Sequence, residues 1–263
     1  MLAALSVKQT AEVKLEVKNN PAGRLHDLLQ LAQRQAPKEP ARKAWAQVFG
    51  VAPEDTGLLL QMLADLIKLM SETKVSIERL DDIDHSIYLK PFAKIERFFS
   101  QVNLDAGWEN WGAQLDEPTL YGLQFAADRL SRISGSTTIA QDDIQSIQSE
   151  LEQFVESVLA SDLPQGLKAL FLRNLESIRH ALLVYRIRGV EGLEHELERA
   201  VGSLMLNKAE IPPAGSKSTS RNFWERFFLV IERINKAVTL TRGAKELAGP
   251  AVQAISHLLD KTS

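Results

Sequence analysis

Apolar residues recur at intervals of three and four along most of this chain, and this spacing decides which folds the chain can adopt. Positions three and four apart lie on one face of an α-helix, so each such run predicts an amphipathic helix. The runs lie at residues 25–32, 45–49, 58–70, 87–102, 120–130, 144–158, 167–185, 193–204, 223–238 and 252–259. The sequence therefore predicts an all-α protein: a multi-helix bundle over residues 21–207, an N-terminal strand-like arm and a tethered C-terminal helical module.

Particular residues mark where these helices begin and end. The run Leu58–Met70 is apolar on nearly every side, so we expect that helix to lie at the middle of the bundle. Asp116–Pro118 has the acid and proline typical of a first helical turn. Thr138 with Gln141 matches a capping box, and Gly189 after a basic residue indicates a helix end, so that the helices on either side of it form a hairpin.

The first 20 residues follow a different pattern. Apolar side chains fall on odd positions and charged ones on even positions, which is the period of a β-strand with one apolar face. No other run of this kind is visible in the sequence, so the strand needs a partner: another copy, another protein, or a short stretch not recognised. The alternative is a frayed terminus or an irregular first helix. The residues predicted to pair in the strand are Val7, Val13, Leu15 and Val17.

A boundary separates the bundle from the C-terminal module. Residues 208–220 combine Pro-Pro with Gly, Ser and Thr, a composition that interrupts a helix and is typical of a linker. The module, residues 221–263, opens with a basic amphipathic helix over 221–241 that gathers four aromatic side chains. Burying them would stabilise the chain by about 15 kcal/mol as an upper bound, so they are expected to contact the chain's own core, a second protein or a bilayer. The predicted partner or membrane contacts are Phe223, Trp224, Arg226, Phe227, Phe228, Arg233 and Lys236.

Charge and composition exclude several classes of protein. The net charge is −3, and residues 51–160 carry 8 basic and 19 acidic side chains, so no dense basic face for nucleic acid is expected. The chain has no cysteine, which excludes disulfides, thiol enzymes and Cys-ligated metals and agrees with a reducing compartment. No apolar run approaches the roughly 20 residues that span a bilayer, and no signal-peptide pattern is present. A cytoplasmic location is the default expectation.

Three groups of residues carry the types found in metal or hydrolytic sites. Asp81, Asp82, Asp84 and His85 offer three carboxylates and an imidazole within five residues. Neighbouring residues on a helix or turn point in different directions, so a solvated acidic turn or cap is the simpler interpretation. Glu176 with His180, and Glu191 with His195, are spaced to ligate a metal from one helix face, but surface ion pairs explain them as well.

The remaining motifs predict no site. Gly215-Ser216-Lys217-Ser218 lacks the glycines and the preceding strand of a phosphate-binding loop, so it reads as linker. Trp108 and Trp111 either stack on a ligand or fill the core, and filling the core is the more common role. No motif identifies a known family. The sequence predicts no cofactor, no metal and no identifiable small-molecule ligand.

These observations favour a non-catalytic interaction or regulatory protein over an enzyme. It would assemble with itself or a protein partner through the N-terminal arm and the C-terminal amphipathic helix. The first alternative is an effector that associates with a membrane surface through the helix at 221–241. The second is a metal-dependent hydrolase built around residues 81–85.

Overall fold

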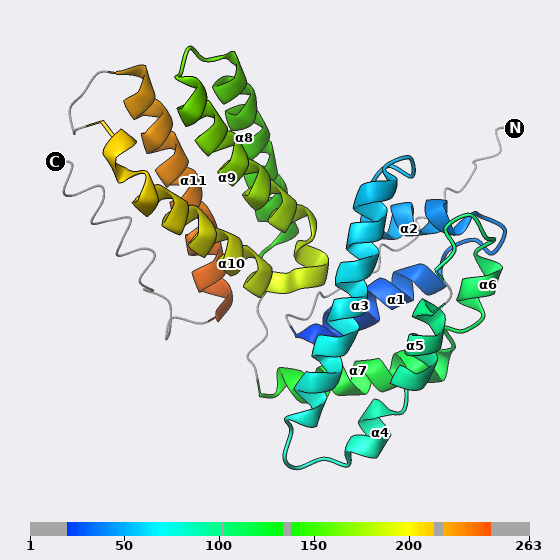
Figure 1. The fold of residues 1–263 in the computed structure, drawn as a ribbon. Helices are drawn as coiled ribbons and strands as arrows, with labels where there is room; N and C mark the ends of the chain where they lie inside the picture. Colours follow the sequence, from blue (N-terminus) through cyan, green and yellow to red (C-terminus); the bar gives the residue numbers. More distant parts are fainter. Residues whose placement is uncertain (1–19, 101, 134–137, 213–217, 243–263) are drawn as a thin grey trace, which may run out of the picture.

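The structure is a computed structural model that describes residues 20–100, 102–133, 138–212 and 218–242 (Figure 1). Within these ranges the regular elements are helices and no strand is formed, which confirms the prediction of an all-α protein. Residues 1–19 of the predicted N-terminal arm, with the pairing residues Val7, Val13, Leu15 and Val17, lie outside the described residues. So do the linker residues 213–217 and the module beyond residue 242.

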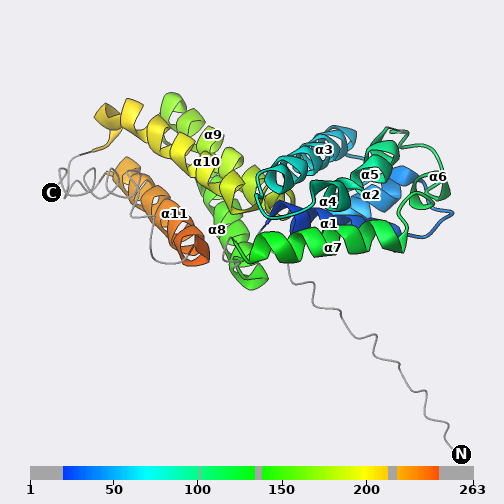
Figure 2. The same ribbon diagram turned by 90° about the horizontal axis from the view of Figure 1, so that it is seen from below.

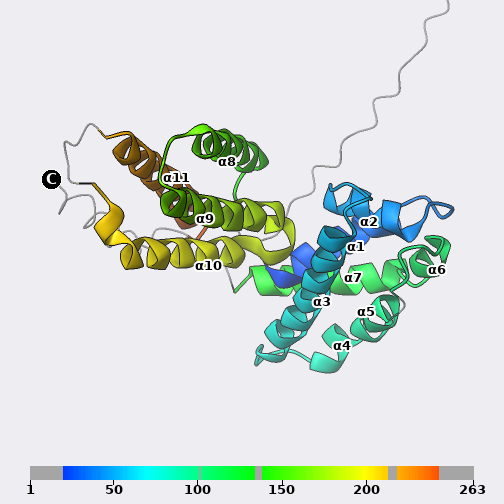
Figure 3. The same cartoon turned by 45° about the horizontal axis from the view of Figure 1, so that its top comes forward.

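Two hydrophobic cores organise the helices, whereas the apolar periodicity of the sequence predicts one bundle over residues 21–207. Figures 1 and 3 show the two groups side by side, with the start of α10 reaching the first group at α1 and α3. The first unit contains α1 (Pro21–Gln33), α2 (Ala41–Phe49), α3 (Thr56–Glu78), α4 (His85–Leu89), α5 (Phe92–Phe99), α6 (Glu109–Gly112) and α7 (Glu117–Ser131). The second contains α8 (Gln141–Ala160), α9 (Gln165–Leu183), α10 (Tyr185–Leu206), the 3-10 turn Lys208–Glu210 and α11 (Thr219–Arg242).

In the first unit, α1 lies between α3 and α7 and buries its apolar face against both. Asn20 caps α1 by accepting a hydrogen bond from the Gly23 amide, and its Nδ2 donates to the Ala127 carbonyl on α7 at 3.0 Å. The long helix α3 is buried along one side and exposes Leu60, which is 46% accessible. The prediction that this segment is buried nearly all round is therefore wrong, because a helix at the edge of a core needs only one apolar face.

An aromatic cluster fills the part of the first core between α2, α5 and α6. Trp45 on α2 meets Trp108 and Trp111 edge-on, with ring centroids 5.4 and 5.7 Å apart. Trp108 and Trp111 stack on each other, and each is 1% exposed. Their role here is therefore to fill the core. Edge-to-face and stacked pairs add to the stabilisation that ring burial provides.

In the second unit, the backbone breaks twice between α9 and the main body of α10. α9 ends at Leu183, and Gly189 adopts φ 68° and ψ −163°, a conformation that only glycine adopts readily. The helix boundary predicted at Gly189 is thus present as a kink inside α10. The capping box predicted at Thr138 and Gln141 is wrong: α8 begins after Ala140, and no side chain caps it.

Gly189 generates a first prediction. A Cβ at this position would collide with the guanidinium of Arg24, and the backbone angles are strained for any other residue. We expect Gly189→Ala to lower the free energy of unfolding by about 2 kcal/mol or more. The matched control is Gly202→Ala in the same helix, where a Cβ meets no atom within 4 Å; it should raise stability by about 0.5–1 kcal/mol. Urea denaturation measures the free energy of unfolding of both variants. Equal changes would contradict the conclusion that position 189 requires glycine.

Candidate interaction site

Helix α11 places its apolar face on the chain's own helices α8 and α10. Phe171 on α9 lies at the centre of the contact, with its ring centroid 4.9 Å from Trp224 and 5.5 Å from Phe227. Phe223 is half-buried and stacks on Phe154. The side chains of α11 that are at least nine-tenths buried are Arg221, Trp224, Phe227, Phe228, Val230, Ile231, Ile234, Val238 and Thr241. The face predicted to bind a partner or a membrane is therefore the face that completes the second core.

The predicted basic rim of α11 is held mainly by α8. The Arg226 guanidinium lies 4.6 Å from the centroid of the Phe154 ring and donates to Ser157 Oγ at 3.0 Å. Arg233 donates to Glu150 at 2.5 Å and to Ser146 Oγ at 2.8 Å. Lys236 is exposed. Two of the three basic side chains are thus engaged with protein groups while α11 is docked.

Arg221 joins the two sides of the linker. Its side chain is 10% exposed; Nε donates to Glu225 at 2.8 Å and Nη1 donates to the Pro212 carbonyl at 3.0 Å. Pro212 precedes residues 213–217, and Arg221 lies in the first turn of α11. This contact fixes where α11 starts relative to the end of the preceding segment.

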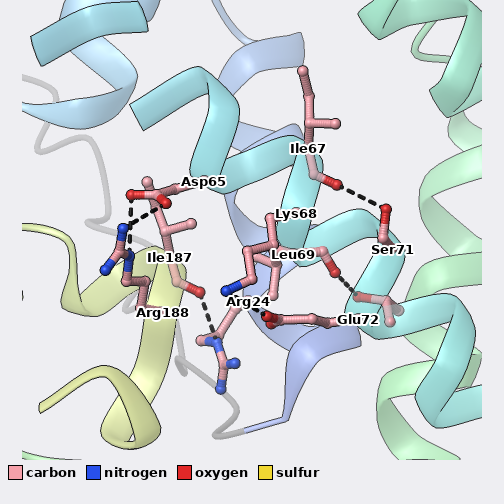
Figure 4. Close-up of polar contacts among 10 residues, drawn as sticks. Arg24, Asp65, Ile67, Lys68, Leu69, Ser71, Glu72, Ile187 and Arg188 are labelled. Carbon is pink, nitrogen blue, oxygen red and sulfur yellow. Dashed lines mark hydrogen bonds and ion pairs between the residues drawn. The ribbon is translucent and has the colours of Figure 1, made fainter. Parts of the chain in front are cut away.

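A second group of polar contacts, which the sequence analysis did not identify, joins the two units (Figure 4). Arg188 on α10 donates to both carboxylate oxygens of Asp65 on α3, at 3.1 and 2.7 Å. Arg24 on α1 is 3% exposed, donates through Nε to the Ile187 carbonyl at 3.0 Å, and lies 3.6 Å from Glu191. Burial lowers the pKa of Arg24 from its ordinary value, and Glu191 partly offsets this. One sequence feature could have indicated that Arg24 is buried: it directly precedes a helical stripe made of apolar residues.

The cleft beside these residues has a volume of about 360 Å³. Its lining is mixed in charge: the basic residues Arg24, Lys68 and Arg188 line it together with the acidic residues Asp65, Glu72 and Glu191. Several of these side chains are already paired with one another, as Figure 4 shows for Asp65 with Arg188 and for Lys68 with Glu72. The arrangement therefore works as a junction between units rather than as a receptor for one sign of charge.

The candidate metal or hydrolytic residues at 81–85 are engaged in other contacts. Asp84 caps α4 by accepting from the Ser86 amide and hydroxyl, hydrogen bonds that lower the pKa of Asp84. Asp82 pairs with Arg129 on α7 at 2.9 Å. Across the ranges that the structure describes, no three His, Cys, Asp or Glu side chains are placed to hold a metal ion. The geometry thus offers residues 81–85 no convergent ligand set.

The residues of the two Glu–His pairs also make other contacts. Glu176 pairs with Arg179, while His180 Nε2 lies 3.0 Å from the Gln61 amide nitrogen on α3. Glu191 faces Arg24, and His195 lines the junction cleft. His180 and Glu191 therefore take part in the contact between the units.

No protein-family model, curated protein or solved structure matches the chain. Among the described helices, none combines the length and the hydropathy that a bilayer crossing requires. The function is therefore argued from the contacts themselves.

The docking of α11 generates a second prediction. Phe227 is fully buried, whereas Leu229, two residues along the same helix, is 61% exposed. We expect Phe227→Ala to lower the free energy of unfolding by about 3–5 kcal/mol, because it removes a ring from the centre of the core. Leu229→Ala should change it by no more than about 0.5 kcal/mol. Thermal or urea unfolding distinguishes the two, and similar losses would mean that α11 does not dock through this face.

His180 generates a third prediction, on pH. Burial and the nearby Arg188 lower the pKa of His180 below its ordinary value of 6.5. The unfolded chain therefore binds the proton more readily, so this contribution to stability is complete above pH 6.5 and decreases as pH falls below it. A protonated Nε2 also no longer accepts the Gln61 hydrogen bond.

The measurement compares unfolding free energies from pH 7.5 down to pH 5 for the wild type and for His180→Gln. The wild type should lose more stability than the variant, and an NMR titration should place the His180 pKa below 6.5. Parallel pH curves would show that the imidazole is not coupled to folding.

Proposed function

We propose that the protein is a non-catalytic interaction protein that assembles with a second copy of itself by exchanging α11. The observation that carries this proposal is that α11 makes its contacts with α8, α9 and α10, which precede residues 213–217 in the sequence. The sequence predicts a linker between them. A second copy presents the same surface. Exchange of an identical element between copies is a low-cost route to a dimer.

The energetics favour exchange over a free α11. Its two fully buried rings alone, Trp224 and Phe227, bury roughly 300–500 Å² in total. At about 25 cal/mol per Å² that is on the order of 10 kcal/mol as an upper bound. A helix released into water loses this term, whereas a helix seated on another copy regains it.

The polar contacts are equally transferable. Arg226 would meet Ser157 and Phe154 of the second copy, and Arg233 would meet its Glu150. Arg221 would donate to the Pro212 carbonyl of the second copy. Exchange would then require only that the predicted linker connects α11 to the second copy, and its Pro, Gly and Ser are residues typical of linkers.

The arm at residues 1–20, with Val7, Val13, Leu15 and Val17, remains a predicted second contact in this proposal. The membrane alternative is less favoured because Arg226 and Arg233 would have to give up their contacts with α8 before meeting anionic lipid. The membrane alternative predicts a different result: the full chain would bind acidic vesicles, and this binding would weaken as salt is added.

The length of the linker provides the fourth prediction. Deleting residues 213–217 shortens the connection between α11 and the helices it packs on in its own chain, so the dimer fraction should rise. Inserting ten Gly and Ser residues at the same place should lower it, since a longer linker favours the closed form. Replacement of the five residues by Gly-Ser-Gly-Ser-Gly keeps the length and is the control. Light scattering after size-exclusion chromatography measures the molar mass. A deletion variant that is folded but remains monomeric would contradict the proposal.

A further inference from the structure

The outer face of α7 exposes apolar side chains that neither the fold nor the contacts of α11 account for. Phe125 is 68% exposed and Tyr121 is 54% exposed, and Ile87 on the adjoining α4 is 65% exposed. In Figure 2, α7 runs along the lower edge of the first unit. Large apolar side chains gathered at one place on a surface indicate an interaction site.

The exposed residues form one stripe. Glu117, Tyr121, Phe125, Asp128 and Arg132 follow one another at steps of four and three, so they lie on one side of the helix. Each of them is exposed. The opposite side of α7 packs into the core through Leu120, Leu123, Ala127 and Leu130.

A hollow of about 260 Å³ lies beside Phe125. Ile87 and Tyr88 bound it from α4, while Gly122, Arg129 and Arg132 belong to the side of α7. Gly122 is required there, because a Cβ would collide with the ring of Pro91. Pro91 occupies the space that a side chain at Gly122 would fill, so the glycine lets the start of α5 approach α7 closely.

We propose that this stripe binds the same stripe of a second copy, with the two α7 helices antiparallel about a two-fold axis beside Phe125. In that arrangement Glu117 of one copy lies opposite Arg132 of the other, and Tyr121 lies opposite Asp128. Each Phe125 ring enters the hollow beside Ile87 of the other copy. The surface is therefore self-complementary, as an isologous contact requires.

Charge complementarity favours a second copy of the chain as the partner on this surface. Of the two acids on the stripe, Glu117 stands at the first turn of α7, whereas Asp128 already pairs with Arg132 at the C-cap. An antiparallel pairing of two copies therefore places Glu117 opposite Arg132. Arg132 uses its Nε and one Nη nitrogen on Asp128, which leaves N–H groups for Glu117 of the other copy. A parallel pairing would instead oppose like charges.

The patch is small beside a standard interface of about 1,600 Å², so the dimer should be weak and depend on concentration. It involves no residue of α11 and does not depend on the exchange proposed above. The experiment therefore uses the full chain with the ten-residue linker insertion, which suppresses exchange. Sedimentation velocity over a range of concentrations reports the dissociation constant.

Phe125→Glu should weaken the dimer at least tenfold, because it places a charge in the hollow. Leu159→Glu is the control: Leu159 is 58% exposed but lies on α8 in the second unit, so the dissociation constant should not change. Both positions are exposed, and circular dichroism confirms that each variant folds. An unchanged dissociation constant for Phe125→Glu would overturn the proposal.

Charge reversal tests the antiparallel register. Glu117→Arg and Arg132→Glu should each weaken the dimer several-fold, because each opposes like charges twice across the axis. The double variant restores opposite charges and should recover most of the affinity. A double variant weaker than either single variant would overturn the antiparallel register. This dimer must persist when the linker is lengthened. A dimer that is lost on lengthening would instead form by exchange of α11.

Discussion

The contact between Arg24 and the backbone beside Gly189 is the interaction on which the relative placement of the two cores depends. A guanidinium that is 3% exposed destabilises the fold unless its donors are matched, and the Ile187 carbonyl accepts a hydrogen bond from one of them. The backbone reaches this position because Gly189 adopts angles that other residues avoid and carries no Cβ. The bidentate pair of Arg188 with Asp65 then fixes the rotation of α10 against α3. Because Asp65 is buried, removing Arg188 would leave its carboxylate without this partner and destabilise the contact.

Periodicity alone predicted the fold class and many of the helices. Local chemistry also placed the start of α7, where Asp116 caps the helix by accepting from the Thr119 amide. Lys94 and Thr119 lower the pKa of Asp116 to about 2, which keeps the cap charged. Signals of this kind depend on residues close in sequence, so a single chain reveals them.

The division into two cores was not predicted, because an apolar stripe identifies the buried face of a helix but not the helix that covers it. Arg24 and Ile187 are separated by 163 positions, and nothing local relates them. The same limit applies to α11: its aromatic face was recognisable, while its seat on Phe171 was not. For residues 81–85 the sequence suggested a cluster, but capping of α4 and pairing of Asp82 with Arg129 direct the carboxylates apart. The exposed Phe125 was missed because it lies outside the apolar stripe.

The distribution of tryptophan between the two cores gives the molecule two separate spectroscopic reporters. Trp45, Trp108 and Trp111 lie within 6 Å of one another in the first unit, close enough for coupled near-ultraviolet circular dichroism. Trp224 is the only other tryptophan of the sequence and lies in the second core. Loss of the coupled signal therefore follows the first core, while fluorescence from a chain with the other three indoles replaced follows the second. Any difference between the two curves on heating would measure how independently the cores melt.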